Sequence, residues 1–226
     1  MATTKAAEKE RLREEKRRIA YEKEELRIDE IRKFEEMYAE YDMICGIDEV
    51  GRGPLAGPVM AGAVILPKGC RIHDINDSKK FSEKKRELLY DIIMKEAVAV
   101  GIGIVGPERI DEINILQATY EAMREAIKNL NVIPDILLND AVTIPGVDIK
   151  QVPIIKGDAK SITIGAASIV AKVTRDRYMI DIASKYPEYG FDSNKGYGSA
   201  AHIAAIKEFG PTPLHRRTFI KNFVEV

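Results

Sequence analysis

Three short apolar runs in this chain end in acidic residues, and this arrangement restricts the fold more than any other feature. The run at residues 43–47 leads into Asp48 and Glu49, the run at 136–138 reaches Asp140 after one asparagine, and the run at 152–155 is followed by Asp158. Short apolar runs bounded by glycine, proline and polar residues are typical of buried strands. Ligand and catalytic sites of open α/β sheets gather beyond the carboxyl ends of the strands. We therefore expect these four acids to lie near one site.

Asp48 and Glu49 are adjacent, and adjacent residues of a strand point to opposite faces. Both can approach one site only if the strand ends here and the backbone bends, which Gly51 and Gly53 permit. A solvated turn is the alternative interpretation of this segment. The sequence from Gly51 to Ala56 also matches a dinucleotide-binding fingerprint, but that motif must open a helix. The prolines at positions 54 and 58, and the apolar run that follows, exclude that interpretation.

The rest of the chain after residue 41 alternates between short apolar runs and longer helical patterns. We expect strands at residues 43–47, 59–66, 98–105, 135–138 and 151–155, and helices at 82–95, 109–129, within 161–185 and at 200–209. Strands that come first in succession and then alternate with helices indicate a mixed sheet covered by helices on both faces. The fold class is therefore α/β.

Residues 1–40 differ in composition from residues 41–226, so we predict a domain boundary between them. The first segment holds 11 Lys and Arg and 12 Asp and Glu, with no glycine or proline, which predicts a long charged helix. A solvated helix is one interpretation of this segment. A coiled coil or a helix that binds a protein partner is the other, although the apolar seam is broken between Leu26 and Ile31.

The overall charge and the cysteines restrict the class of protein. The chain has 35 Lys and Arg against 36 Asp and Glu, a net charge of -1, so any nucleic-acid site must be local. The N-terminus lacks the apolar stretch of a secretory signal, and the longest apolar run, residues 97–106, is too short to span a membrane. Cys45 and Cys70 have neither metal-site nor disulfide-framework spacing. We expect a cytoplasmic protein that is neither secreted nor bound to a membrane and that acts as a monomer.

Four carboxylates at close quarters would repel one another unless cations neutralise them. Oxygen ligands favour Mg²⁺ or Mn²⁺ over zinc, and the three histidines His73, His202 and His215 have no ligand spacing. A pair of such ions can hold a phosphodiester and activate a water molecule. Because no histidine accompanies the acids, water activated by metal is preferred over attack by a 2'-hydroxyl with imidazole help.

The residues that carry this chemistry resemble the signature of the type 2 ribonucleases H, and specifically bacterial ribonuclease HII. The resemblance covers about residues 41–223, and it rests on several motifs that occur in order along the chain. These are DEVGRG at 48–53 with LAGP at 55–58, DSKK at 77–80, Asp140, KGD at 156–158, AASIVAKVTRD at 166–176, KGYGS at 195–199 and LHRRTF at 214–219.

This resemblance implies a five-stranded mixed sheet flanked by helices, with a helical C-terminal part. It implies an endonuclease that cuts RNA in RNA/DNA hybrids and cuts 5' of a single ribonucleotide in duplex DNA, leaving 3'-hydroxyl and 5'-phosphate ends. Asp48, Glu49, Asp140 and Asp158 match the metal-binding acids. Asp176 is also suitably placed in the sequence, but its position between two arginines on a predicted helix favours a surface ion pair.

The resemblance also implies a set of substrate contacts. The glycines of Gly51-Arg52-Gly53 would let the backbone approach a 2'-hydroxyl, and Tyr197 matches a tyrosine that stacks on the sugar at the RNA-to-DNA junction. Ser199 keeps a hydroxyl where threonine is more usual, whereas Asn194 replaces a common histidine and leaves the contacts there open. The candidates for phosphate contacts are Lys79, Lys80, Lys195, Arg216 and Arg217.

Two other functions remain as alternatives. A ribonuclease HIII-like enzyme would cut long hybrids and spare a single embedded ribonucleotide, although residues 1–40 do not resemble the globular N-terminal domain of that subtype. A non-catalytic nucleic-acid-binding protein would use the N-terminal helix as a docking arm. The cleavage position on a duplex with one ribonucleotide distinguishes all three.

Overall fold

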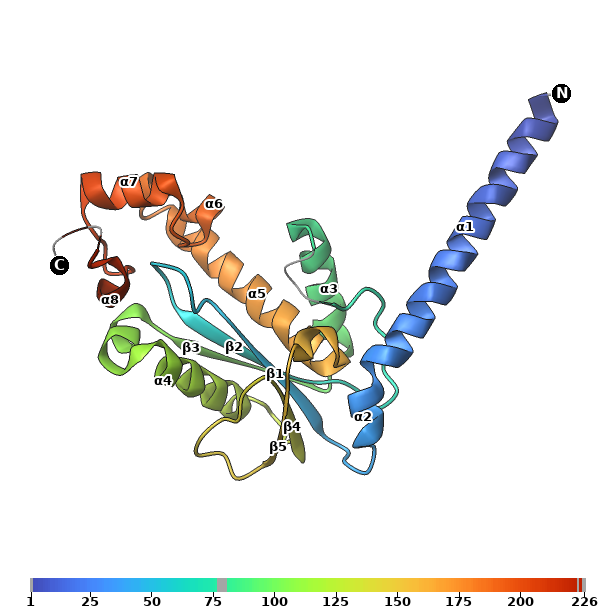
Figure 1. The fold of residues 1–226 in the computed structure, drawn as a ribbon, viewed down its shortest axis with the longest axis horizontal. Helices are drawn as coiled ribbons and strands as arrows, with labels where there is room; N and C mark the ends of the chain where they lie inside the picture. The colour runs from blue at the N-terminus through green and yellow to red at the C-terminus, as the bar shows by residue number, and fades with distance from the viewer. Residues whose placement is uncertain (1, 77–80, 223, 225–226) are drawn as a thin grey trace.

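The protein is built around a five-stranded mixed sheet with helices on both faces (Figure 1). The computed structural model describes residues 2–76, 81–222 and 224. The strands are β1 (Ile44–Val50), β2 (Val59–Ile65), β3 (Ala99–Val105), β4 (Ile136–Asp140) and β5 (Lys150–Ile154), in the spatial order β3-β2-β1-β4-β5. This architecture confirms the fold class expected from the sequence.

The sheet has an antiparallel half and a parallel half that meet at β1. β1 pairs antiparallel with β2, and β2 pairs antiparallel with β3. On its other edge β1 pairs parallel with β4, which pairs parallel with β5. Because β1, β4 and β5 run in the same direction, their carboxyl ends lie along one edge of the sheet.

Two long helices cover the centre of the sheet from opposite faces. α4 (Pro107–Lys128) packs on β2 and β3, and α5 (Ile162–Ala183) packs on β1 and β2, with α3 (Glu83–Glu96) beside α5. The hydroxyls of Ser82 and Ser161 accept hydrogen bonds from backbone N–H groups in the first turns of α3 and α5, which stabilises both helix starts. Asn114 has a φ of 66° and interrupts α4, and its side chain caps the turn that follows.

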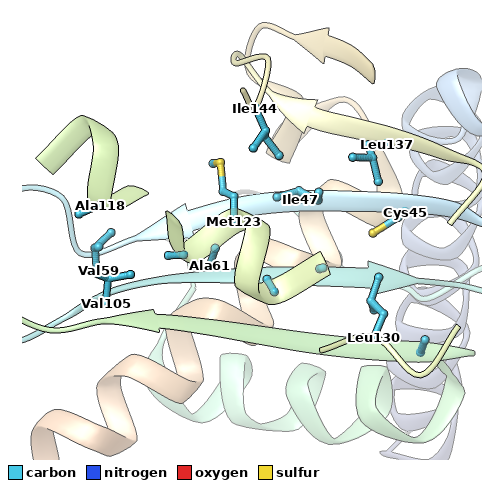
Figure 2. Close-up of a cluster of buried hydrophobic side chains, with 14 of the residues drawn as sticks. Cys45, Ile47, Val59, Ala61, Val105, Ala118, Met123, Leu130, Leu137 and Ile144 are labelled. Atoms are coloured by element: carbon cyan, nitrogen blue, oxygen red, sulfur yellow. The ribbon is translucent and has the colours of Figure 1, made fainter. Parts of the chain in front are cut away.

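Apolar side chains fill the space on each side of the sheet. Figure 2 shows the cluster between α4 and the sheet, in which Met123 lies near Ile47 and Ala61, and Ala118 lies near Val59 and Val105. A second cluster lies between the opposite face, α3 and α5. A strand with buried side chains on both faces is typical of the central position in such a sheet, and this position holds β1 and its acids rigidly.

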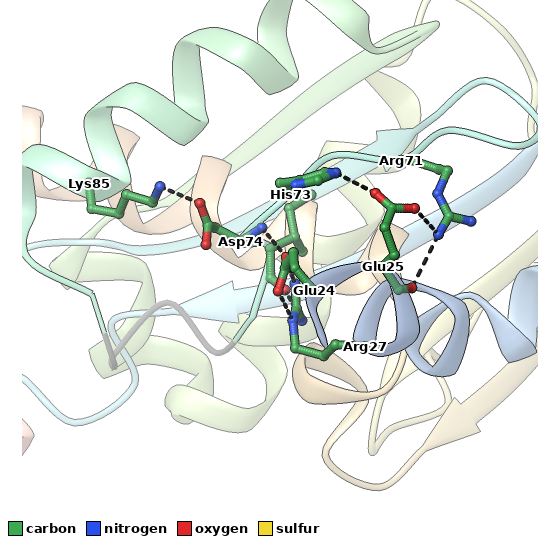
Figure 3. A network of polar contacts seen from close by, with 8 residues as sticks. Glu24, Glu25, Arg27, Arg71, His73, Asp74 and Lys85 are labelled. Carbon is green, nitrogen blue, oxygen red and sulfur yellow. Dashed lines mark hydrogen bonds and ion pairs between the residues drawn. The ribbon is translucent and has the colours of Figure 1, made fainter. Parts of the chain in front are cut away.

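The N-terminal segment forms α1 (Ala2–Ile31) and the short α2 (Lys33–Met37). The first part of α1 projects away from the body of the protein (Figure 1), whereas its last turns lie on that body. Ile28 is fully buried. The guanidinium of Arg27 donates to the carbonyl of Ile75, and Arg71 pairs with Glu25, as Figure 3 shows. Part of the predicted N-terminal extension is therefore attached to the rest of the chain by specific contacts.

The C-terminal part is helical, as expected. It comprises the short helices η3 (Pro187–Tyr189), α6 (Phe191–Asn194) and α8 (Arg217–Ile220), together with α7 (Ala200–Phe209). Tyr189, Phe191, His202 and His215 pack their rings together, which holds these short elements in one layer. Among the described residues, no helix is both long and apolar enough to cross a membrane.

Candidate active site

Asp48 and Glu49 lie inside β1, which continues to Val50. The expectation that the strand ends before these acids was wrong, because β1 pairs with β2 as far as the Val50–Met60 position. The two carboxylates therefore leave opposite faces of the strand. Asp48 is only 7% exposed and is hydrogen-bonded by Ser168 of α5.

β4 and the turn after β5 bring the other two acids towards Asp48. In the parallel pairing Ile47 is opposite Asn139, so Asp48, inside β1, and Asp140, at the end of β4, follow at neighbouring positions. The Oδ1 atom of Asp140 accepts a 2.7 Å hydrogen bond from the N–H of Gly157. Gly157 begins the 3-10 helix η2 (Gly157–Ala159), which contains Asp158. This hydrogen bond places Asp158 in the segment next to Asp140.

The surroundings of Asp48 and Glu49 disfavour the ionised form of both carboxyl groups. Burial raises the pKa of the Asp48 carboxyl well above its usual value, and the charges of Glu49 and Asp140 raise it further. Burial also raises the pKa of Glu49, although Arg52 offsets part of this effect through a 3.2 Å ion pair. Carboxylates that are buried without full compensation attract a cation.

This donor set fits a hard divalent cation because all of its ligands are oxygen atoms. Asp48, Glu49, Asp140 and Asp158 are the residues that would hold it. In the described parts of the chain, no three His, Cys, Asp or Glu side chains already form a closed metal-binding group. The acids lie near one another without forming a complete set of ligands.

The loop Gly51-Arg52-Gly53 leaves β1 directly beside these acids. Gly51 is buried with a φ of 90°, a conformation that glycine adopts without strain. Gly53 is exposed, and a Cβ atom built on it would meet only Cε1 of Tyr197, at 4.0 Å. Tyr197 is 45% exposed. The structure therefore brings the acids, the glycine loop and Tyr197 to one side of the molecule, with open space at Gly53.

The remaining predicted contacts differ in their surroundings. Lys79 and Lys80 lie outside the described residues. The ammonium of Lys195 donates to the carbonyl of Asp192, and the hydroxyl of Ser199 caps α7 by accepting from the N–H of His202. Arg217 is exposed.

Arg216 does not fit the role of phosphate contact that the sequence indicated. Its side chain is fully buried. Its guanidinium donates to the carbonyls of Gly51, Arg52 and Gly57. A phosphate could reach this group only if these hydrogen bonds were broken, so in this structure Arg216 supports the loop from inside.

Arg175 was not among the predicted site residues, and the structure gives Asp176 and Asn194 surroundings that the sequence did not predict. Arg175 is fully buried and donates to the carbonyls of Ala56, Pro58 and Lys195. Asp176 does form the expected ion pair, with Lys172 at 2.7 Å, but it is buried and not on the surface. Asn194 joins two turns, because its side chain donates to the carbonyl of Tyr189 and accepts from the N–H of Gly196. In the sequence, the only indication of these hydrogen bonds and ion pairs was the polar or charged type of each residue.

Comparisons with known proteins bear on the family and the fold. The family model for Ribonuclease HII matches residues 45–222. A ribonuclease HII from Lachnoclostridium phytofermentans is 67% identical over 205 residues, which cover 89% of this chain and 81% of that protein. The crystal structure of ribonuclease H2 from Pyrococcus horikoshii has a TM-score of 0.64 and 27% identity, and the match covers 81% of this chain and 99% of that one.

A more distant structure shows the same fold. Bst-RNase HIII in complex with Mn²⁺ has a TM-score of 0.57 at 16% identity, and the match covers 78% of this chain and 67% of that chain. The family model covers most of the chain, including β1, β4, η2 and the segment around Tyr197. The chain belongs to the ribonuclease HII family of endoribonucleases.

Proposed function

We propose that this endoribonuclease hydrolyses RNA in RNA/DNA hybrids and also cuts 5' of a single ribonucleotide in duplex DNA, leaving 3'-hydroxyl and 5'-phosphate ends. The proposed reaction uses two Mg²⁺ or Mn²⁺ ions, and the proposed role in the cytoplasm is to start the removal of ribonucleotides from DNA. The observation that carries this proposal is that the exposed Gly53, on the loop that follows Asp48 and Glu49, lies next to Tyr197, with Asp140 on the neighbouring strand.

The acids and the loop would have separate tasks. Bound divalent ions would lower the pKa of a water molecule and stabilise the leaving oxygen. Asp48 and Asp140 are held by β1 and β4 on the rigid centre of the sheet, so they would fix where the scissile phosphate lies. Burial at Asp48 also limits access of bulk water, which strengthens electrostatic interactions there.

The glycine loop and Tyr197 would provide selectivity for the ribonucleotide. A 2'-hydroxyl is the group that distinguishes RNA from DNA at a given position. Gly53 presents backbone with no side chain, and the Tyr197 ring faces it. A sugar placed over the two would contact the exposed backbone of Gly53 and the neighbouring aromatic ring. The manganese bound to Bst-RNase HIII supports a divalent ion in an enzyme of this fold.

The direct test is cleavage of a labelled DNA duplex that contains one ribonucleotide, with Mg²⁺ or Mn²⁺ and with a chelator. We expect a single cut 5' of that residue, and no cut with chelator. Asp48→Asn should lose at least about 1,000-fold in rate, because it removes a metal ligand's charge while keeping its shape. Asp181→Asn, on an exposed part of α5, is the matched control and should keep full activity.

The same assay separates the alternatives. Cleavage of a long hybrid with no cut at the single ribonucleotide would indicate ribonuclease HIII-like selectivity. Full activity of Asp48→Asn, or no cleavage with either ion, would reject the proposed mechanism.

Tyr197→Ala tests the reading of the junction. If Tyr197 packs on the sugar there, this variant should lose at least about tenfold more activity on the single ribonucleotide than on a long hybrid, since stacking on a base or sugar contributes about 1–3 kcal/mol. An equal loss on both substrates would contradict this role.

A further inference from the structure

Arg175 and Arg216 are the two largest fully buried side chains of the described protein. A buried guanidinium is usually paired with a carboxylate, because an isolated buried charge is costly. Within the described residues, neither arginine forms an ion pair, and every hydrogen bond of both goes to a backbone carbonyl. Two buried guanidinium groups that bind only backbone carbonyls indicate that the conformation of that backbone is important.

Arg216 fixes the orientation of two successive peptide groups. Its guanidinium binds the carbonyls of Gly51 at 2.5 Å and Arg52 at 2.9 Å. In a planar trans peptide the C=O and the following N–H point in opposite directions. With both carbonyls turned inward to Arg216, the N–H groups of Arg52 and Gly53 point away from it.

These two N–H groups are available to a ligand. Arg52 and Gly53 are both exposed, and neither N–H donates to any acceptor in the described part of the chain. Successive backbone N–H groups that point to the same side form a site for an electronegative oxygen. Tyr197 lies next to this site, since a Cβ atom built on Gly53 would be 4.0 Å from its Cε1 atom.

Arg175 supports the segments that adjoin the same loop. It holds Ala56 and Pro58 in the segment that returns to β2, and it holds Lys195 in the segment that leads to Tyr197. A Cβ atom at Gly51 would lie 2.4 Å from its Nε atom. The two guanidinium groups therefore fix the backbone on and around the loop, and turning the Gly51 and Arg52 peptides over would break their hydrogen bonds to Arg216.

We propose that Arg216 is a positioning residue that turns the N–H groups of Arg52 and Gly53 outward as paired donors to the 2'-oxygen of the ribonucleotide at the cleavage site. The proposal rests on the proposed function, and it assigns the selectivity for ribose to an arginine that never touches the substrate. Lysine at this position would keep a positive charge but could not bridge the carbonyls of Gly51, Arg52 and Gly57 at once.

The test compares wild type and Arg216→Lys on two substrates, one with a ribose at the cleavage site and one with 2'-fluoro in place of the 2'-hydroxyl. Fluorine is a far weaker hydrogen-bond acceptor than a hydroxyl oxygen. Wild type should cleave the 2'-fluoro substrate at least about tenfold more slowly than the ribose substrate in single turnover. A tenfold change corresponds to about 1.4 kcal/mol, the contribution of one hydrogen bond. In Arg216→Lys the two substrates should differ by less than about threefold.

The matched control is Arg124→Lys, which changes a surface arginine that also donates to a carbonyl, that of Pro145. It should behave as wild type on both substrates. A purely structural role for Arg216 predicts an equal loss on ribose and 2'-fluoro, and this outcome would overturn the proposal. In another outcome, Arg216→Lys still discriminates between ribose and 2'-fluoro but no longer discriminates against a methylphosphonate at the neighbouring phosphate. This result would show that the N–H donors bind phosphate, and it would also overturn the proposal.

A measurement on wild type covers the case in which Arg216→Lys does not fold. Amide hydrogen exchange by NMR, with chelator present to prevent cleavage, should show the N–H groups of Arg52 and Gly53 protected by a duplex with one ribonucleotide and not by an all-DNA duplex. Equal protection by both duplexes, or none by either, would reject the proposal that these two N–H groups donate to the 2'-oxygen. Absence of cleavage by wild type would instead reject the proposed function, so the two failures can be told apart.

Discussion

Replacing Gly53 by alanine should separate substrate recognition from folding. Gly53 does not have a positive φ, and a Cβ atom there would make an ordinary 4.0 Å contact with Tyr197 Cε1 and no other contact within 4 Å. An alanine that fits the native backbone stabilises a protein by about 0.4–1 kcal/mol, because it restricts the unfolded chain. We therefore expect the melting temperature of Gly53→Ala to equal or slightly exceed that of wild type.

The same methyl group should strongly impair cleavage. Carbon atoms in contact lie about 3.5–4.0 Å apart, so a methyl on Gly53, 4.0 Å from Tyr197 Cε1, would fill the space beside the ring and hold a sugar away from the exposed backbone of Gly53. Losing a hydrogen bond to the ribose and the packing around it would cost about 1.4–3 kcal/mol. This corresponds to a decrease in kcat/KM of about 10- to 100-fold.

The assay is kcat/KM on the duplex with a single ribonucleotide, together with thermal unfolding of each variant. Gly106→Ala is the matched control, because Gly106 also has a negative φ and a methyl group added there would have no atom within 4 Å. Gly51→Ala is the contrasting variant: its φ of 90° and the 2.4 Å approach to Arg175 predict loss of stability as well as activity. Wild-type kcat/KM for Gly53→Ala would refute the assignment of this space to the substrate.

Two further predictions concern stability. In the absence of metal, Asp48→Asn should melt at a higher temperature than wild type, because it removes a buried charge that Glu49 and Asp140 repel. Each kcal/mol gained should raise the melting temperature by about 2–4 °C. Added Mg²⁺ or Mn²⁺ should raise the melting temperature of wild type only. His215 has a pKa lowered to about 4 by burial and by His202. Since the unfolded chain takes up this proton near pH 6.5 and the folded chain does not, the melting temperature should fall as the pH drops from about 6.5 to about 4, and His215→Gln should show a flatter profile in thermal scans. An unchanged slope in His215→Gln would contradict this.

The sequence predicted the elements of the sheet because their local signals agree with the tertiary structure. All five strands and the helices α3, α4, α5 and α7 occur within a few residues of the expected ranges. The end of β1 was misplaced because charged residues inside a strand look like a strand end. Asp48 and Glu49 are tolerated there since Ser168 and Arg52 interact with them.

The roles of the buried arginines could not be predicted in this way. In the sequence, Arg216 stands beside Arg217 in a basic pair, and that composition is typical of a phosphate contact. Only the tertiary structure shows that one of the pair is exposed and the other fully buried. The attachment of α1 was hidden for the same reason, because Glu25 and Arg71 meet across 46 residues of sequence.

The near-neutral charge of the chain now has a structural explanation. A nucleic-acid enzyme needs positive charge near the substrate, but this positive charge need not lie on the surface. Arg175 and Arg216 place two guanidinium groups beneath the glycine loop, neither in an ion pair with a carboxylate among the described residues, where solvent screens them little. The acids of β1 and β4 lie on the neighbouring part of the site and would be neutralised by divalent ions. The balance of 35 basic against 36 acidic residues therefore hides a local separation of charge, with the acids of β1 and β4 in one part of the site and two buried guanidinium groups beneath the neighbouring loop.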